Sequence, residues 1–169
     1  MPVLNVVNMN KILIKLKGKI ESNQGLIVFG QNKAKFEDWI KVELCGILGK
    51  YDGKIIPEKD DIDITSNKLE IELKIFVTNG TYEEVEDVPS KNVTENRNGI
   101  IKDFVDLKKR HGKERAVIFI VFPVSGESDN WVKHRLAIED RIGKELPKPI
   151  EFTFKDTKIN GLIYYVLVE

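Results

Sequence analysis

The chain has 169 residues, of which 41% are hydrophobic, and its 27 basic and 27 acidic side chains cancel to a net charge of zero. This length is typical of a single domain that buries a substantial core, and the composition excludes a disordered chain. No apolar run approaches the roughly 18 residues that span a bilayer, so we expect no membrane partner.

The first 34 residues are expected to hold one helix and one short apolar stretch. The apolar residues that share a helical face are Ile12, Leu13, Leu16 and Ile20. Alternate residues of the same segment would equally fit a strand, and we favour the helix. The apolar stretch 26–29 follows and ends at Gly30.

A helix is expected from about residue 35 to 48, where Gly49 provides a stop signal. Its apolar stripe consists of Phe36, Trp39, Ile40, Leu44 and Ile47. Glu43 is the one charged residue inside that stripe. It either lies at the edge of the stripe and reaches water, or it has a role in the interior.

A hairpin of two amphipathic strands is the most informative local pattern. After a short strand at 55–57, residues 61–65 and 69–74 alternate strictly between polar and apolar side chains. With Ser66 and Asn67 as the two turn residues, Asp61 lies opposite Glu72. The polar residues that then share one face are Asp61, Asp63, Glu70, Glu72 and Lys74.

The second half of the chain supplies the remaining elements. We expect irregular chain over 76–98 and then, in order, a helix at 98–110, an almost wholly apolar central strand at 116–124, a helix at 130–144, and strands at 150–154 and 162–168 joined through Asn160 and Gly161. This order predicts an α/β protein with a mixed central β-sheet flanked by helices.

The acidic face of the hairpin indicates a cation site. Opposed carboxylates lie about 5 Å apart and repel one another, and one lysine cannot neutralise four of them. Mg²⁺ uses one or two carboxylates, several waters and a substrate phosphate, and a lysine on the same face could stabilise charge on that phosphate. The alternative is a solvated sheet face with ordinary salt bridges.

These residues carry a resemblance to a known family. A helix with Glu43, a strand that opens Asp61-Ile62-Asp63-Ile64, and the following Glu72-Leu73-Lys74 resemble the PD-(D/E)xK nuclease superfamily. The resemblance covers about 36–124 and implies a restriction-endonuclease-like core there. Residues 1–34 would be an N-terminal extension of the single nuclease-like domain 1–169.

The resemblance also assigns roles to individual residues. Asp61 and Glu72 would be the metal ligands, with Asp63 as the alternate to Asp61, and Lys74 would be the catalytic lysine. Glu43 would be an accessory ligand or would hold a water. The implied activity is that of a Mg²⁺- or Mn²⁺-dependent endonuclease or exonuclease, in which a metal-activated water hydrolyses a phosphodiester bond of DNA.

Because the net charge is zero, nucleic acid would have to be bound by local basic patches. The candidate residues are Lys108, Lys109, Arg110, Lys133 and Arg135. Such runs are otherwise solvated helix ends. His111 and His134 are expected to be surface histidines, and Cys45 a small core residue.

Two further expectations concern the location of the protein and its assembly. Residues 1–7 show no signal peptide, and a single cysteine fits a reducing compartment, so we expect a cytoplasmic protein. A homodimer is an alternative to a monomer. Two other functions stay open: a catalytically silent nucleic-acid or protein binding module on the same fold, and a phosphohydrolase that acts on small molecules.

Overall fold

The computed structural model describes residues 6–80, 83–86, 93–124 and 129–169. The helices within these ranges are α1 (Val6–Ser22), α2 (Leu26–Gln31), α3 (Glu37–Leu48), α4 (Val93–Lys108) and α5 (Asp129–Ile142). The strands are β1 (Ile56–Lys59), β2 (Ile62–Thr65), β3 (Leu69–Val77), β4 (Glu114–Phe122), β5 (Ile150–Thr153) and β6 (Asn160–Leu167).

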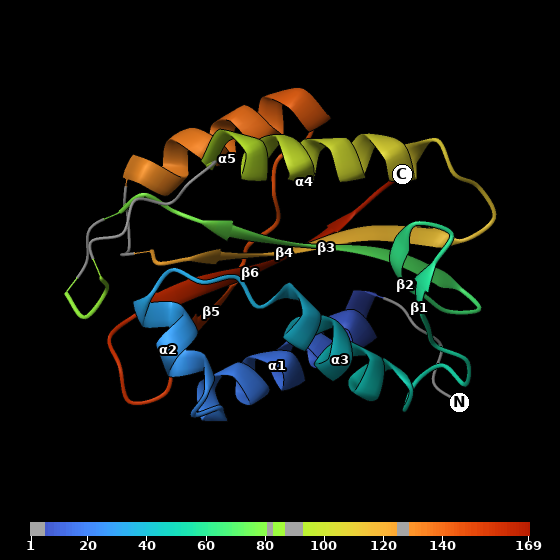
Figure 1. Cartoon of the computed structure of the whole chain (residues 1–169). Coiled ribbons are helices and arrows are strands. Elements are labelled where there is room, and N and C mark those ends of the chain that lie inside the picture. Colours follow the sequence, from blue (N-terminus) through green and yellow to red (C-terminus); the bar gives the residue numbers. More distant parts are fainter. Residues whose placement is uncertain (1–5, 81–82, 87–92, 125–128) are drawn as a thin grey trace.

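The strands of the described chain form one mixed sheet in the order β1-β2-β3-β4-β6-β5. β3 and β4 are parallel, and the other neighbours are antiparallel. A parallel pair needs a crossover connection, which α4 supplies. Helices α1, α2 and α3 cover one face of the sheet, and α4 and α5 cover the other (Figure 1). The chain is thus an α/β protein with a six-stranded mixed sheet packed against helices.

The apolar core is divided by the sheet into two clusters. In β4, Ile118 and Ile120 belong to the cluster under α1 and α3, whereas Val117 and Phe119 belong to the cluster under α4 and α5. This confirms the prediction of a central strand covered on both faces. No helix among the described residues has the length and apolar character required to cross a lipid bilayer.

The helical interpretation of the N-terminal segment is confirmed. Ile12, Leu16 and Ile20 are fully buried along one side of α1, while Ile14 is 53% exposed. A strand would have placed Ile12, Ile14 and Leu16 on one face, and the exposure of Ile14 excludes that. The helix expected at 35–48 is also confirmed, and Gly49 is its C-cap.

Several expected boundaries are wrong; β3, for example, continues to Val77, where the expected strand ended at 74. α4 begins at Val93, five residues before the expected start at 98, so the irregular segment is shorter than expected; its residues 81–82 and 87–92 lie outside the described residues. Asn160 and Gly161 are not a connection but the first residues of β6. A Cβ atom at Gly161 would lie 2.2 Å from Phe152 Cζ, so glycine is needed where β5 and β6 pair.

Candidate active site at the edge of strand β3

The site lies where β3 extends beyond its short neighbour β2. The β2–β3 ladder pairs Ile64 with Ile71 and Thr65 with Glu70. Farther along β3, carboxylates instead of a strand satisfy the backbone N–H groups. Leu73 donates to Asp63 Oδ2 at 2.8 Å, and Ile75 donates to Glu37 Oε2 at 2.7 Å. Two acidic side chains from different elements are thereby held at one sheet edge.

The predicted hairpin register is wrong by two residues. The turn residues are Asn67 and Lys68, because Ser66 still pairs with Leu69: its N–H donates to the Leu69 carbonyl at 2.8 Å. The Ser66 hydroxyl also accepts hydrogen bonds from the Lys68 and Leu69 N–H groups, at 3.2 and 3.0 Å. A serine in this role closes the turn one residue later than expected. The residue opposite Glu72 is therefore Asp63, the alternate ligand, and not Asp61.

Asp61 belongs to the turn between β1 and β2 and not to β2 itself. Asp60 and Asp61 both have positive φ, 56° and 61°, and they separate the paired residues Lys59 and Ile62. This is the backbone of a type I′ hairpin turn, in which aspartate is tolerated. Asp61 still lines the same cleft as Asp63, but it is exposed, whereas Asp63 is partly buried.

Glu72 and Lys74 project from β3 toward α4. Lys74 Nζ lies 3.2 Å from Asp103 Oδ2 on α4, and the Asp103 side chain is only 11% exposed. The helix therefore covers this face of the hairpin, and the alternative of a solvated face is wrong for Glu72 and Lys74, which are half-buried. A register shift of two residues keeps Glu72 and Lys74 on their expected face. The expected alternation fails at the start of β2, where Ile62 belongs to the core cluster under α4 and α5 and Ile64 to the cluster under α1 and α3.

The carboxyl groups of Asp63 and Glu72 share a hydrogen bond, and their pKa values shift in opposite directions. Burial, this hydrogen bond and the negative charges of Asp103 and Asp63 raise the pKa of Glu72 to about 8. Burial also opposes ionisation of Asp63, but hydrogen bonds from Lys41, the Leu73 N–H and Glu72 outweigh it and lower the pKa of Asp63. At neutral pH the pair therefore holds one proton on Glu72.

Burial raises the pKa of the third carboxyl group, Asp103, although the Lys74 amine acts in the opposite direction. Burial of Lys74 would favour its neutral amine, but the charge and hydrogen bond of Asp103 prevail and raise the pKa of Lys74. Lys74 therefore stays cationic inside the cleft at physiological pH.

A second lysine anchors Asp63 from the other side of the sheet. Lys41 on α3 lies 2.9 Å from Asp63 Oδ1, forms a short ion pair with Glu58 of β1, and is 14% exposed. Burial favours the neutral amine, but the hydrogen bonds and charges of Glu58 and Asp63 outweigh it and raise the pKa of Lys41. Lys41 thus ties α3 to the hairpin and orients the Asp63 carboxylate.

A cleft of about 550 Å³ lies between the β1–β2 turn, β3 and α4. Its lining includes Asp61, Asp63, Glu72, Lys74, Asp103 and Arg110. Of the predicted basic residues, only Arg110 lines the cleft, and its guanidinium already binds Glu70 at 2.9 and 3.2 Å. Lys108 lies at the end of α4, Lys109 pairs with Asp106 at 2.9 Å, and Lys133 and Arg135 lie on α5, where Arg135 pairs with Glu139.

The structure does not bring Glu43 to the cleft. Glu43 faces α1, where its carboxylate lies 3.3 Å from Lys19 Nζ. The residue of α3 that reaches β3 is Glu37, six positions earlier. Six residues turn a helix about 120° short of two full turns, so Glu37 and Glu43 cannot point to the same place.

Sequence reasoning missed Glu37, Lys41 and Asp103. Glu37 and Lys41 are four residues apart, a spacing that places both on one side of α3 and could have linked them. Asp103 lies among Ile100, Phe104 and Leu107 on the buried stripe of α4. The position of Asp103 inside an apolar stripe could have been noticed in the sequence, just as the position of Glu43 was. Its contact with Lys74 could not.

His134 differs from its prediction as a surface residue. Its ring is partly buried, with its centroid 5.1 Å from that of Phe76, and burial lowers the pKa of its imidazole. Cys45 is partly buried beside the core under α1 and α3, and burial raises the pKa of its thiol. Neither residue lines the cleft.

The chemistry of the donor set matches Mg²⁺, which takes oxygen ligands and uses as few as one or two carboxylates. Asp63 and Glu72 supply such a pair, and the proton held by Glu72 occupies the position where a cation would compensate charge. Among the described residues, no group of three or more acidic, histidine or cysteine side chains is already arranged around a metal position. Any cation would thus rely on water and substrate for its other ligands.

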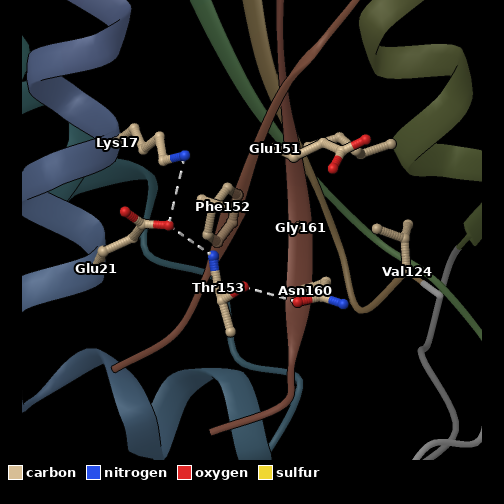
Figure 2. Close-up of a pocket in the computed structure, with 9 residues that line it drawn as sticks. Lys17, Glu21, Val124, Glu151, Phe152, Thr153, Asn160 and Gly161 are labelled. Atoms are coloured by element: carbon tan, nitrogen blue, oxygen red, sulfur yellow. Dashed lines mark hydrogen bonds and ion pairs between the residues drawn. The ribbon is translucent and has the colours of Figure 1, made fainter. Parts of the chain in front are cut away.

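A different hollow, of about 250 Å³, lies where α1 meets β5 and β6. Figure 2 shows Glu21 reaching from α1 to the backbone of the edge strand, where its carboxylate accepts the Thr153 N–H at 3.1 Å. Lys17 lies 3.8 Å from Glu21, and the Thr153 hydroxyl donates to Asn160 at 2.8 Å. The Glu21 carboxylate thus satisfies an N–H at the free edge of β5, whose other edge pairs with β6, and this is a structural role.

Comparisons with known proteins matched no protein-family model, no curated protein and no solved structure. The function is therefore proposed from the site itself.

Proposed function

We propose that this protein is a Mg²⁺- or Mn²⁺-dependent phosphodiester hydrolase that acts on DNA, with Asp63, Glu72 and Lys74 as its central residues. The observation that carries the proposal is their meeting in one cleft. Asp63 lies at the edge of β3 on the hydrogen bond from Leu73, and Glu72 and Lys74 project from β3 into the same space.

The order of elements supports the finer assignment to a restriction-endonuclease-like core. The segment from α3 through β1, β2, β3 and α4 to β4 contains a helix, a meander that ends in the Glu72-Leu73-Lys74 strand, a crossover helix and an apolar parallel strand. We propose that this segment is the catalytic core, with α1 and α2 as an N-terminal addition that completes the cover of one sheet face.

The chain's own residues have separable tasks in this proposal. Asp63 and Glu72 would hold the cation, which supplies Lewis-acid polarisation of the phosphate and lowers the pKa of water. Lys74 carries a positive charge into a partly desolvated cleft, where it stabilises the negative charge that develops on the phosphate. Asp103 positions the Lys74 amine, and Lys41 orients Asp63.

A second candidate, a catalytically silent binding module, is favoured by one specific observation. Both Asp63 oxygens are already engaged, Oδ1 by Lys41 and Oδ2 by the Leu73 N–H. A carboxylate oxygen has lone pairs for a second partner, so these bonds do not exclude a cation. They do give Asp63 a structural role that it would keep without any catalysis.

Metal binding followed by cleavage separates the two candidates. Isothermal titration with Mn²⁺ and then incubation with plasmid, linear duplex and single-stranded DNA should give metal binding and Mg²⁺-dependent products for the hydrolase. Asp63→Asn and Glu72→Gln should abolish both. Wild-type protein that binds DNA but releases no product from any of the three substrates, under either metal, would identify the binding module.

A further inference from the structure

A second hollow, with three aromatic side chains in its lining, lies on the α3 side of β3, whereas the acidic cleft lies on the α4 side. It measures about 520 Å³, within the range of ligand pockets, and it is formed by α2, the α2–α3 connection and the first turn of α3. Phe29, Phe36 and Trp39 line it, with ring centroids 6.3 Å apart from Phe29 to Phe36 and from Phe36 to Trp39. Phe29 is 39% exposed, whereas Phe36 is buried, so the ring of Phe29 is partly open to a ligand.

Glu37 connects this hollow to the cleft. Its side chain lines the hollow, and its Oε2 accepts the Ile75 N–H at 2.7 Å. Ile75 directly follows Lys74, and the charge of Glu37 acts on the Lys74 amine, so Glu37 lies between the hollow and the cleft at the edge of β3. A nucleic-acid strand that reaches from the cleft around this edge would place the base of a neighbouring nucleotide in the hollow.

The charges around the hollow decide which part of a nucleotide it suits. Glu37 and Asp38 contribute two carboxylates, and the Asp38 side chain is fully exposed. Carboxylates repel a phosphate but accept hydrogen bonds from the exocyclic amine of a base. Lys35, the one lysine of the lining, is held on the α4 side by Asn96, 2.6 Å from its amine. Aromatic walls with carboxylate acceptors suit a base and not a phosphate.

We propose that this hollow, which we call the aromatic pocket, binds an unpaired nucleobase next to the scissile phosphodiester, so that single-stranded or frayed nucleic acid is the substrate class. A base paired within a duplex keeps its faces stacked on its neighbours and cannot enter between side chains, whereas an unpaired base can stack on an aromatic ring. The inference rests on the proposed function and adds the strand structure of the substrate.

Phe29 is the residue to test, because its side chain is 39% exposed and it belongs to neither core cluster. Phe29→Leu keeps apolar bulk and removes the ring, Phe29→Tyr keeps the ring, and Val28→Ala is the matched control, since Val28 is the preceding residue of α2, 59% exposed and outside the pocket lining. Binding of a fluorescent single-stranded oligonucleotide and of its blunt duplex is measured by anisotropy with EDTA present, so that nothing is cut.

Phe29→Leu should weaken single-strand binding by roughly 5- to 150-fold, the range for one stacked base, with duplex binding unchanged. Phe29→Tyr should bind like wild type, and so should Val28→Ala. Equal single-strand binding by Phe29→Leu and wild type, at unchanged melting temperatures, overturns the inference, and so does a wild type that prefers the duplex.

The metal-dependent reaction separates this inference from the proposed function. If wild type cleaves DNA and Phe29→Leu binds single strands as wild type does, the base-binding role of the aromatic pocket is refuted and the proposed hydrolase activity is supported. If wild type cuts no substrate but Phe29→Leu still loses single-strand binding, the proposed hydrolase activity is refuted and the pocket is supported as a base-binding site.

Discussion

Asp63 Oδ2 accepts the backbone N–H of Leu73 at 2.8 Å, and this bond brings the Asp63 carboxylate beside Glu72. Asp61, two residues earlier, belongs to a type I′ turn with φ of 61°. The two aspartates line one cleft, but only Asp63 has its position defined by the edge of β3.

The first prediction distinguishes these aspartates. Asp63→Asn should lose the Mg²⁺-dependent rise in melting temperature, and Asp61→Gly should retain it. Binding to the folded state at 100 times Kd is worth about 2.7 kcal/mol, or roughly 5–10 °C for a chain of this size. Asn can still accept the Leu73 N–H, so the fold should survive, and Gly suits the positive φ of residue 61. A lost response in Asp61→Gly alone would identify Asp61 as the ligand.

The second prediction concerns stability and pH without metal. The folded protein keeps a proton on Glu72 up to about pH 8, whereas the unfolded chain releases it near the ordinary pKa of 4.5. Folding therefore loses stability as pH rises from about 4.5 to 8. Glu72→Gln imitates the protonated form, so its melting temperature should match wild type at pH 5 and exceed it at pH 9. Glu145→Gln, at an exposed position, should follow the wild-type curve throughout.

The third prediction concerns metal affinity. A cation that binds Asp63 and Glu72 must displace the Glu72 proton, so Mg²⁺ affinity should rise up to about tenfold per pH unit below pH 8 and level off above it. Titration calorimetry at pH 7 in two buffers of different ionisation enthalpy should show release of about one proton per metal. Binding without proton release would place the cation away from Glu72.

The fourth prediction separates catalysis from binding. Lys74→Ala should lower the cleavage rate by about 10²-fold or more while DNA affinity changes little, because one amine is a small part of a binding surface. Lys102→Ala is the matched control: Lys102 lines the same cleft, but its side chain is 75% exposed and pairs with Asp106 at 3.0 Å. Unaltered cleavage by Lys74→Ala would show that Lys74 has no catalytic role and that Glu72-Leu73-Lys74 is not a catalytic motif.

The fifth prediction concerns the basic residues at the C-terminal end of α4. Replacing Lys108 and Lys109 by Ala should weaken DNA binding and reduce its salt slope by about 0.7–0.9 per lysine that contacts a phosphate. Arg110→Ala should instead destabilise the fold by about 1.5–3 kcal/mol, since it removes two charge-assisted hydrogen bonds from the buried Glu70. Anisotropy at several salt concentrations measures the effect on DNA binding, and chemical denaturation measures the effect on stability. An Arg110→Ala protein of wild-type stability would contradict the predicted structural role of Arg110.

The sequence by itself determined the elements and the faces of their side chains. Helical spacing identified α1 and α3, a continuous apolar run identified β4, and strict alternation placed Asp63, Glu72 and Lys74 on one face of the hairpin. These are local properties, because a repeat of 3.6 or 2 residues depends only on backbone geometry.

Tertiary structure decided which of these side chains meet. The hairpin register depended on the Ser66 hydroxyl, which moved Asp63 opposite Glu72. Glu37 and Asp103 entered the site only because α3 and α4 pack against opposite sides of β3, with Glu37 on the Ile75 N–H and Asp103 on the Lys74 amine. Glu43 does not reach the site, because the helical repeat of α3 points its side chain toward α1. Contacts between residues tens of positions apart are set by how whole elements pack, and no periodicity within one element contains that information.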